Sequence, residues 1–248
     1  MAFNPYSLEG KTVLVTGASS GIGKATAIAC SRLGAHVIVS GRNSERLQET
    51  FSELDGEGHL QIIADLTDED QIALLAEFVP PLDGFVNNAG GGNKIPINFI
   101  KRVTLQNILD VNTIAPILLS RYLLKKKKLK RGASMVITSS IAGVCSVDIG
   151  NTLYSVSKSA VDGFMKNAAK ELAEKGIRVN SVNPGMVDTP INDYTSVSEE
   201  HKLADLTNYP LKRHGKTELI AYAIIYLLSD AAAWVTGTAL KIDGGYSL

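Results

Sequence analysis

Short runs of apolar, largely β-branched residues alternate with longer amphipathic stretches along almost the whole chain. We expect strands at residues 12–16, 36–40, 59–64, 83–87, 134–139, 177–182 and 239–242. Helical periodicity lies near residues 21–33, 44–54, 68–79, 104–126, 154–174 and 217–229. The strand runs are almost continuously apolar, as in a parallel sheet covered on both faces. Strict alternation of strand and helix therefore predicts an α/β fold with a doubly wound parallel sheet of about seven strands.

The 248 residues carry enough apolar material for one large core, since 45% are hydrophobic and 20% are charged. No linker or shift in composition divides the chain, so we predict a single domain over residues 1–248. The segment 190–211 breaks the pattern, because it is polar and irregular. Connections of that length are uncommon unless they are functional, so it reads either as a substrate-binding lid or as a surface excursion.

The composition argues against several classes of protein. The formal net charge is zero, so no global field attracts nucleic acid or an anionic membrane, and neither is an expected partner. No stretch reaches the ~18 continuous apolar residues of a membrane span, and the first ten residues do not look like a signal peptide. The two cysteines are far apart and the four histidines lie at no ligand spacing. We expect a cytoplasmic protein with no disulfide framework and no metal site.

A glycine-rich turn follows the first predicted strand and opens the first predicted helix. In an open α/β sheet, ligands bind beyond the carboxyl ends of the strands, where a helix N-terminus offers free N–H groups and positive potential. Glycines let the backbone approach a pyrophosphate without a Cβ clash. The turn therefore indicates a Rossmann-type dinucleotide site, although a tight strand–helix connection is the alternative for a glycine-rich turn taken alone. Its residues are Gly17, Ala18, Ser19, Ser20, Gly21, Ile22 and Gly23.

Three further segments point to the same edge of the predicted sheet. The fourth predicted strand is followed by 87–90, the fifth by Ser139 and Ser140, and the next helix carries Tyr154 and Lys158. Residues four apart share one helix face, so Lys158 lies beside Tyr154. A free phenol titrates at about 10, and a neighbouring ammonium favours its ionised form. We therefore expect a depressed pKa for Tyr154 and a role in proton transfer, although such a pair alone is usually structural.

Taken together, the motifs resemble the short-chain dehydrogenase/reductase family, and the resemblance covers essentially the whole chain. The spacing between Ser140 and Tyr154 is one residue longer than in many members. We choose Ser140 over Ser139 because it directly precedes Ile141, Ala142 and Gly143, which is where the resemblance places the serine. The motifs are TGASSGIG at residues 16–23, NNAG at 87–90, TSSIAG at 138–143, YSVSK at 154–158, NPGMVDTP at 183–190 and WVTGTALKIDGG at 234–245.

The resemblance implies four catalytic residues. Tyr154 is the expected acid that protonates a carbonyl oxygen, and Ser140 the donor that holds that oxygen in place. Lys158 is expected to bind the nicotinamide ribose and to lower the pKa of Tyr154. Asn112 matches the residue that organises a water relay to the lysine. Without the resemblance, a mid-helix Asn reads as a solvated or back-bonding side chain.

The same resemblance implies further contacts to the dinucleotide. Asp65 is expected at the adenine amino group with Leu66 packed on the ring, although Asp65 also reads as a helix cap. The remaining expected contacts are Asn88, Ala89 and Gly90 near the adenosine ribose, Pro184, Gly185 and Val187 around the nicotinamide, and Thr189 at its carboxamide or the phosphates.

The end of the second predicted strand bears on the choice of cofactor. An NAD site usually places Asp or Glu there, to bond the ribose 2′-hydroxyl. This chain instead has Ser40, Arg42 and Asn43, and the guanidinium of Arg42 suits a 2′-phosphate. We therefore favour NADP(H), with NAD(H) as the alternative.

These features predict an oxidoreductase that interconverts a ketone and a secondary alcohol. The alternatives are a non-catalytic dinucleotide sensor on the same fold, or a relative acting on a sugar, a steroid or a small ketone. The predicted helices 104–126 and 154–174 carry apolar residues on more than one face, which indicates a second packing partner beyond their own sheet (Ile114, Ile117, Leu118, Val161, Phe164 and Met165). The resemblance implies that this helix pair forms one contact of a homotetramer and the C-terminal strand region the other. The resemblance is nearest to 3-oxoacyl-acyl-carrier-protein reductase-like members, and it implies that basic residues at Arg131 and Lys175 receive an acidic acyl carrier protein with a 3-oxoacyl substrate. Both residues belong to a local basic cluster, for which a solvated helix end is the alternative (Lys125, Lys126, Lys127, Lys128, Lys130, Arg131 and Lys175).

Overall fold

The computed structural model of the protein describes residues 3–92, 94–189 and 204–248. Within these residues, seven parallel strands form one sheet in the order β3-β2-β1-β4-β5-β6-β7. The order reverses direction between β1 and β4, which in an open α/β sheet creates a crevice at the carboxyl ends of the strands. The strands are β1 Thr12–Thr16, β2 His36–Gly41, β3 Leu60–Ile63, β4 Leu82–Asn87, β5 Leu129–Thr138, β6 Arg178–Pro184 and β7 Ala239–Ile242.

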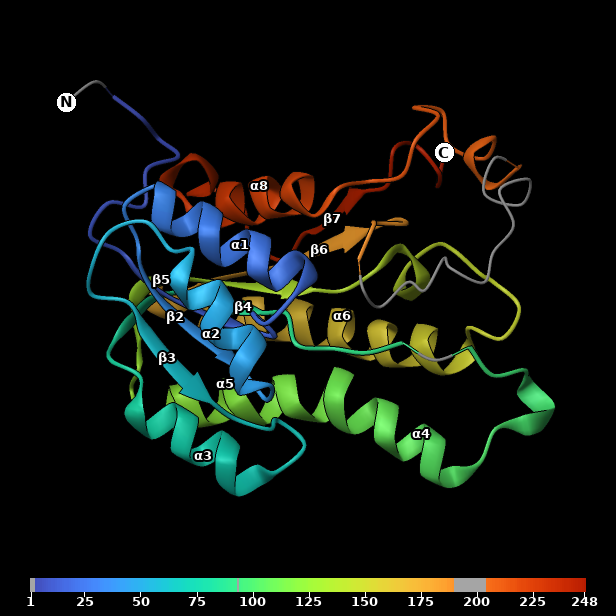
Figure 1. Ribbon diagram of the computed structural model, residues 1–248, viewed down its shortest axis with the longest axis horizontal. Helices are drawn as coiled ribbons and strands as arrows, with labels where there is room; N and C mark the ends of the chain where they lie inside the picture. Colours follow the sequence, from blue (N-terminus) through green and yellow to red (C-terminus); the bar gives the residue numbers. More distant parts are fainter. Residues whose placement is uncertain (1–2, 93, 190–203) are drawn as a thin grey trace.

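Helices cover both faces of this sheet (Figure 1). One apolar core lies between the sheet and α3, α5 and α6, and includes Phe85 and Leu119. The other lies between the sheet and α1, α2 and α8, and includes Val15 and Ile224. Burial on both faces explains why the strand runs are apolar without alternation. The helices are α1 Gly21–Arg32, α2 Ser44–Ser52, α3 Glu69–Phe78, α4 Arg102–Leu109, α5 Ala115–Lys125, α6 Thr152–Leu172 and α8 Thr217–Leu228.

The doubly wound parallel sheet predicted from the alternation is confirmed, with two differences in its elements. Strand β5 begins five residues earlier than expected, because Leu129 pairs with Leu82 ahead of a register shift. The expected helix over 104–126 is divided into α4 and α5 by a wide π turn at Asp110–Ile114. Pro116 has no N–H to donate to the carbonyl four residues back, which favours a break in the α-helical ladder here.

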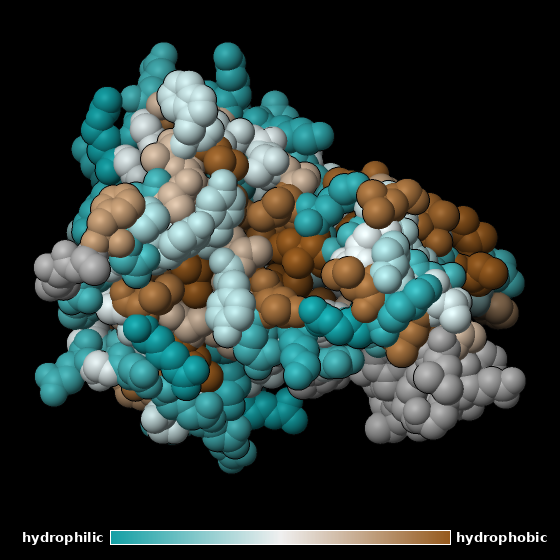
Figure 2. All heavy atoms as spheres, turned by 90° about the horizontal axis from the view of Figure 1, so that it is seen from above, coloured by the Kyte–Doolittle hydropathy of each residue, from teal (hydrophilic) through white to brown (hydrophobic). Residues whose placement is uncertain are grey.

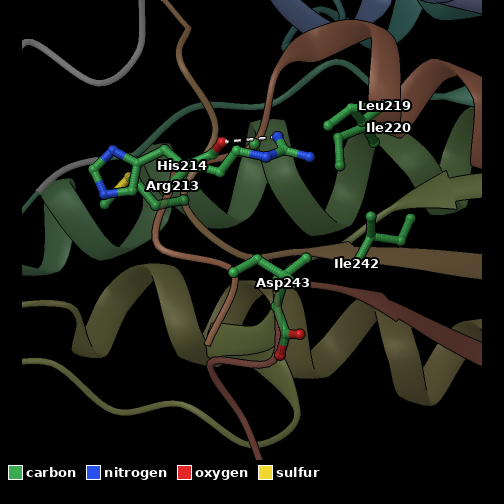
Figure 3. A pocket seen from close by; sticks show the side chains of 10 residues that line it. Arg213, His214, Leu219, Ile220, Ile242 and Asp243 are labelled. Carbon is green, nitrogen blue, oxygen red and sulfur yellow. Dashed lines mark hydrogen bonds between the residues drawn. The ribbon is translucent and has the colours of Figure 1, made fainter. Parts of the chain in front are cut away.

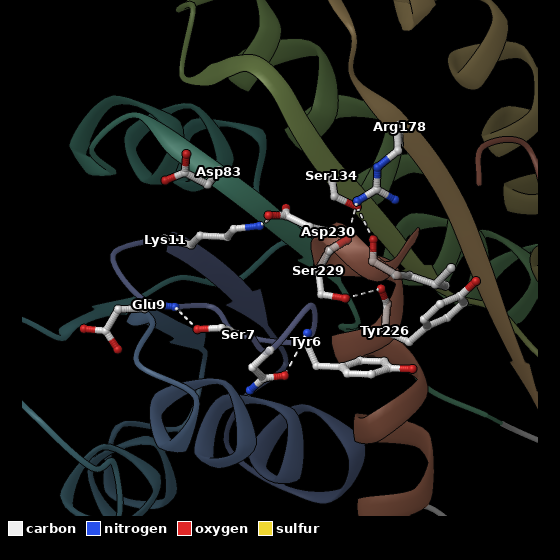
Figure 4. Close-up of polar contacts among 12 residues, drawn as sticks. Tyr6, Ser7, Glu9, Lys11, Asp83, Ser134, Arg178, Tyr226, Ser229 and Asp230 are labelled. Carbon is white, nitrogen blue, oxygen red and sulfur yellow. Dashed lines mark hydrogen bonds and ion pairs between the residues drawn. The ribbon is translucent and has the colours of Figure 1, made fainter. Parts of the chain in front are cut away.

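Polar contacts join the elements at the amino-terminal end of the sheet (Figure 4). Lys11 pairs with Asp230 at 2.5 Å, and the guanidinium of Arg178 donates to the carbonyl oxygen of Ser229 at 3.2 Å, at the end of α8. A cation there is stabilised by the negative end of the helix dipole. The predicted site lies at the opposite, carboxyl end of the sheet.

The second apolar face proposed for helix 154–174 is smaller than the sequence suggests. Val161 and Met165 are fully buried in the chain's own core, so they do not form an outer surface. Val103, Ile114 and Val156, on or between α4 and α6, are the large apolar side chains that stay exposed there. Among the described residues, no helix is both long and apolar enough to cross a membrane.

Candidate active site

The glycine-rich turn connects β1 to α1 with a geometry that only glycine permits at two positions. Gly17 has φ +63°, and a Cβ there would lie 2.8 Å from the Cα of Ala89. A Cβ on Gly23 would lie 2.2 Å from the carbonyl oxygen of Gly17. These short separations hold the turn against the end of β4 and against the first turn of α1. A side chain at either position would fill the cradle that a pyrophosphate needs.

At the N-terminus of α1, no side chain of the described residues caps the free N–H groups or balances the positive end of the helix dipole. Ser20 occupies the N-cap without a side-chain capping bond, and no acidic residue lies in the first turn. Helix N-termini without such partners present N–H groups and positive potential to a ligand. Ser19, Ser20 and Ile22 are partly exposed beside this end of the helix. The residues present therefore fit the phosphates of a dinucleotide.

Asn88 and Thr16 fasten the turn to β4. The amide nitrogen of Asn88 donates to the carbonyl oxygen of Thr16 at 3.1 Å. The buried hydroxyl of Thr16 accepts from the backbone N–H groups of Asn88 at 3.0 Å and Ala89 at 3.2 Å. Thr16 was not singled out from the sequence, because a Thr that ends a strand has no distinctive local pattern. In this structure Asn88 supports the glycine-rich turn directly.

Ser40, Arg42 and Asn43, the residues expected near a 2′-phosphate, differ in how accessible their side chains are to a ligand. Ser40 is fully buried, and among the described residues its hydroxyl has no hydrogen-bond partner. The side chain of Asn43 caps α2 by accepting from the N–H of Arg46 at 2.9 Å. Arg42 is exposed, and its charge helps to lower the pKa of Asp65. Of the three, Arg42 has the side chain best placed for an anion.

Asp65 lies just beyond the end of β3 and does not cap a helix. Its Oδ1 accepts from the N–H of Thr67 at 2.9 Å and from the Thr67 hydroxyl at 2.8 Å, and these bonds are the main cause of its lowered pKa. Asp68 caps α3 instead. Leu66 is partly buried against the core. The helix-cap alternative for Asp65 is therefore wrong.

Ser140 and Tyr154 face each other across the loop that joins β5 to α6. Tyr154 is half-buried, and burial raises the pKa of its phenol, while a hydrogen bond with the Ser140 side chain acts in the opposite direction. The hydroxyl of Ser139 points elsewhere, donating to Asp162 Oδ2 at 2.9 Å. The structure thus separates the two adjacent serines, and it is Ser140 that lies at Tyr154.

Lys158 is buried one helical turn after Tyr154. Its Nζ lies 5.7 Å from the centre of the Tyr154 ring and donates to the carbonyl oxygen of Thr138 at 2.8 Å. Burial lowers the pKa of Lys158 to about 8, and the charge of Asp162 partly opposes this shift. The expected lowering of the Tyr154 pKa is wrong for this structure, because desolvation of the phenol outweighs the other influences on it.

Asn112 lies in the π turn and joins three parts of the site. Its Oδ1 accepts from the N–H of Gly91 at 2.8 Å, and its Nδ2 donates to the carbonyl oxygen of Gly91 at 2.8 Å and to the Ser157 hydroxyl at 2.9 Å. A Cβ on Gly90 would lie 3.1 Å from Asn112 Oδ1 and 3.3 Å from Lys158 Nζ. The reading of Asn112 as a solvated side chain is therefore wrong, and Gly90 belongs beside the Tyr154–Lys158 pair.

The segment after β6 forms the other side of this edge. The N–H of Gly185 donates to the carbonyl oxygen of Ile242 at 3.1 Å, and Val187 pairs with Gly215 in an isolated bridge. Next to it, at the end of β7, lies a cavity of about 100 Å³ lined by Arg213, His214 and Asp243, among others (Figure 3). The segment begins at Pro184, the last residue of β6, and is described as far as Thr189. Of the predicted lid over 190–211, residues 190–203 lie outside the described part.

Comparisons with known proteins agree on one family. A family model described as Enoyl-(Acyl carrier protein) reductase matches residues 17–247. The chain is 36% identical over 244 residues to a 3-oxoacyl-[acyl-carrier-protein] reductase of Thermotoga maritima, covering 96% of this chain and 98% of the relative. It is 33% identical over 249 residues to L-xylulose reductase of Caenorhabditis elegans, with 98% of each chain covered.

A solved structure gives the same result. The chain superimposes with a TM-score of 0.90 on a putative NAD(P)-dependent gluconate 5-dehydrogenase from Beutenbergia cavernae with bound NADP, at 31% identity over 98% of this chain and 99% of the other. The fold and the site define a nicotinamide-dinucleotide-dependent oxidoreductase. The chain belongs to the short-chain dehydrogenase/reductase family.

Proposed function

We propose that the protein interconverts a ketone and a secondary alcohol, with Tyr154 as the proton donor in the reductive direction. The observation that carries the proposal is the half-buried phenol of Tyr154 beside the Ser140 hydroxyl, with the buried ammonium of Lys158 one turn behind it. A bound nicotinamide dinucleotide would supply the hydride for the carbonyl carbon. Ser140 holds the carbonyl oxygen, and Tyr154 gives it a proton as the hydride arrives.

Lys158 and Asn112 prepare that proton transfer. The buried ammonium of Lys158 would bind the ribose hydroxyls of the dinucleotide, and the positive nicotinamide of the oxidised form would act against the rise that burial causes in the pKa of Tyr154. Asn112 holds the Gly91 backbone and Ser157 in place around the lysine. The turn from Gly17 to Gly23 would bind the pyrophosphate, with Asp65 and Leu66 at the adenine and Pro184, Gly185, Val187 and Thr189 at the nicotinamide.

The test of this function is NADPH oxidation with a panel of β-keto esters, diketones, sugars and steroids. We expect turnover of at least one carbonyl compound. A protein that binds the dinucleotide and turns over none of the panel would instead support the dinucleotide sensor.

We propose NADP(H) as the preferred cofactor, because Arg42 is exposed at the end of β2 and no acidic residue is there. Replacing Arg42 with Ala is expected to lower the ratio of kcat/KM for NADPH to that for NADH by at least about tenfold, since a charge-assisted hydrogen bond contributes roughly 1.5–3 kcal/mol. The exposed Arg32, at the opposite end of α1 from the glycine-rich turn, provides a matched Arg→Ala control. A wild-type preference for NADH, or an unchanged ratio in the Arg42 variant, would reverse the assignment.

A 3-oxoacyl group on acyl carrier protein is the second candidate substrate, supported by the name of the Thermotoga relative and by the basic cluster. Two of its lysines, Lys126 and Lys130, are already in ion pairs with Glu77 and Asp83. Arg131 lines a polar cavity of about 340 Å³ near the beginning of β5. Ser140 is nine residues further along, at the other end of the sheet and at most roughly 30 Å away. A carrier docked on this cluster therefore lies at the opposite end of the sheet from Ser140 of the same chain.

Charge reversal at Lys128 and Arg131 tests carrier docking. We expect kcat/KM for a carrier-bound 3-oxoacyl substrate to fall by about tenfold and to lose most of its salt dependence, while the same acyl group on a small thiol is unaffected. Equal slowing of both substrates would eliminate carrier recognition at this cluster.

We also propose a homotetramer. Exposed apolar residues on α4 and α6 support one contact, and the fully exposed Trp234 near β7 supports another. Figure 2 shows the face over α1 and α8, where apolar side chains lie among hydrophilic ones. Light scattering at micromolar concentration is expected to report four subunits, and a monomer would refute the proposal.

A further inference from the structure

Asp162 is a buried carboxylate on α6, one turn after Lys158 and two turns after Tyr154. The residue is 4% exposed. Its Oδ1 accepts from the Ser181 hydroxyl at 2.7 Å, and its Oδ2 accepts from the Ser139 hydroxyl at 2.9 Å and from Asn183 Nδ2 at 3.0 Å. One carboxylate thus joins α6 to the carboxyl ends of both β5 and β6.

Asn183 extends this contact to the reacting end of the site. The same Nδ2 that bonds Asp162 also donates to the carbonyl oxygen of Ser140 at 3.1 Å. Its Oδ1 accepts from the Ser181 hydroxyl at 2.8 Å. Asp162 therefore fixes the backbone of Ser140 through Asn183, and the same network holds the strand end that leads into Pro184 and Gly185.

The stability of the fold does not by itself explain why a charged carboxylate is buried at position 162. A buried carboxylate costs free energy of desolvation, and well-packed apolar residues often replace buried charges without loss of stability. On α6 the charged group facing Asp162 is Lys158, whose pKa the carboxylate raises against the effect of burial. The groups that β5 and β6 direct at Asp162 are Ser139, Ser181 and Asn183, which do not titrate.

We propose that Asp162 is a positioning residue for the proposed reaction. It holds Ser140 against Tyr154 through Asn183, and it keeps a negative charge behind Lys158. The inference rests on the proposed carbonyl reduction, because it assigns Asp162 a place in that site.

Asp162→Asn separates the two effects. An amide at this position can reproduce the hydrogen bonds, because its oxygen accepts from Ser139 and Asn183 while its NH₂ donates to the Ser181 hydroxyl. Only the charge is lost. We expect the alkaline limb of the kcat/KM profile for carbonyl reduction to move to lower pH, with little change in kcat at pH values where Lys158 remains protonated. NMR titration of Lys158 should show a lowered pKa independently of turnover.

Asp162→Ala removes both the charge and the hydrogen bonds. We expect kcat to fall by at least about tenfold more than in the Asn variant at every pH, as is common when a reacting group is misplaced. Asn167→Ala is the matched control, since Asn167 is exposed on the same helix and bonds only to Gly163 in the described structure.

Asn and Ala variants that keep the wild-type pH profile and kcat would overturn the inference. If the Ala variant does not fold, as judged by circular dichroism, the pH profile and the Lys158 titration of the Asn variant decide. A wild type that turns over no carbonyl compound would instead overturn the proposed function. An unchanged Lys158 titration in the Asn variant contradicts the charge role of Asp162 whether or not the wild type is active.

Discussion

Tyr154→Phe is expected to lower kcat for carbonyl reduction by at least about 100-fold, or about 2.7 kcal/mol in barrier height, because general acid catalysis contributes 10²–10⁴-fold. The variant keeps the ring that lies 5.7 Å from Lys158 Nζ and loses only the hydroxyl beside Ser140. Dinucleotide affinity should stay close to that of the wild type, since the phenol hydroxyl transfers a proton and does not hold the pyrophosphate. Steady-state kinetics and fluorescence titration with NADPH measure the two quantities.

Tyr122→Phe is the matched control for that experiment. Its hydroxyl donates to Glu69 Oε1 at 2.8 Å, on α5 and away from Ser140. It should retain full turnover. If Tyr154→Phe keeps activity within tenfold of the wild type, a difference of about 1.4 kcal/mol, then Tyr154 is not the proton donor.

Gly23→Ala is expected to weaken dinucleotide binding by at least about tenfold, because the turn must open before a Cβ fits. The added carbon would lie 2.2 Å from Gly17 O and 2.6 Å from Asn88 Nδ2. The first of these is backbone and cannot rotate away. Overpacking of this kind costs about 1–3 kcal/mol, and each kcal/mol lowers Tm by roughly 2–4 °C in a chain of this size. Thermal unfolding and NADPH titration measure both effects.

Gly163→Ala controls for the substitution itself. A Cβ on Gly163 meets nothing within 4 Å, and the residue lies inside α6. Ala is favoured over Gly in a helix by roughly 0.5–1 kcal/mol, so this variant should be as stable as the wild type or more so. Wild-type affinity and Tm in Gly23→Ala would show that the turn tolerates a side chain and is not the phosphate cradle.

The sequence by itself determined the order and type of the secondary structure. The bounds of β1 and β7 are those predicted, because a buried parallel strand is apolar along its whole length and turn residues flank it. The pairing of Tyr154 with Lys158 was also predictable, since two residues four apart on a helix are neighbours whatever the rest of the chain does.

Tertiary structure decided the features that depend on residues far apart in the chain. Asn112 meets Ser157 across 45 positions and Asp162 meets Ser139 across 23, and no local pattern specifies such pairs. Ser40 looks like a ligand in the sequence, yet the fold buries it completely. The pKa of Tyr154 depends in the same way on what surrounds it. An adjacent lysine predicted a lower value, but burial raises it, because desolvation is set by the whole fold and not by the neighbours along one helix.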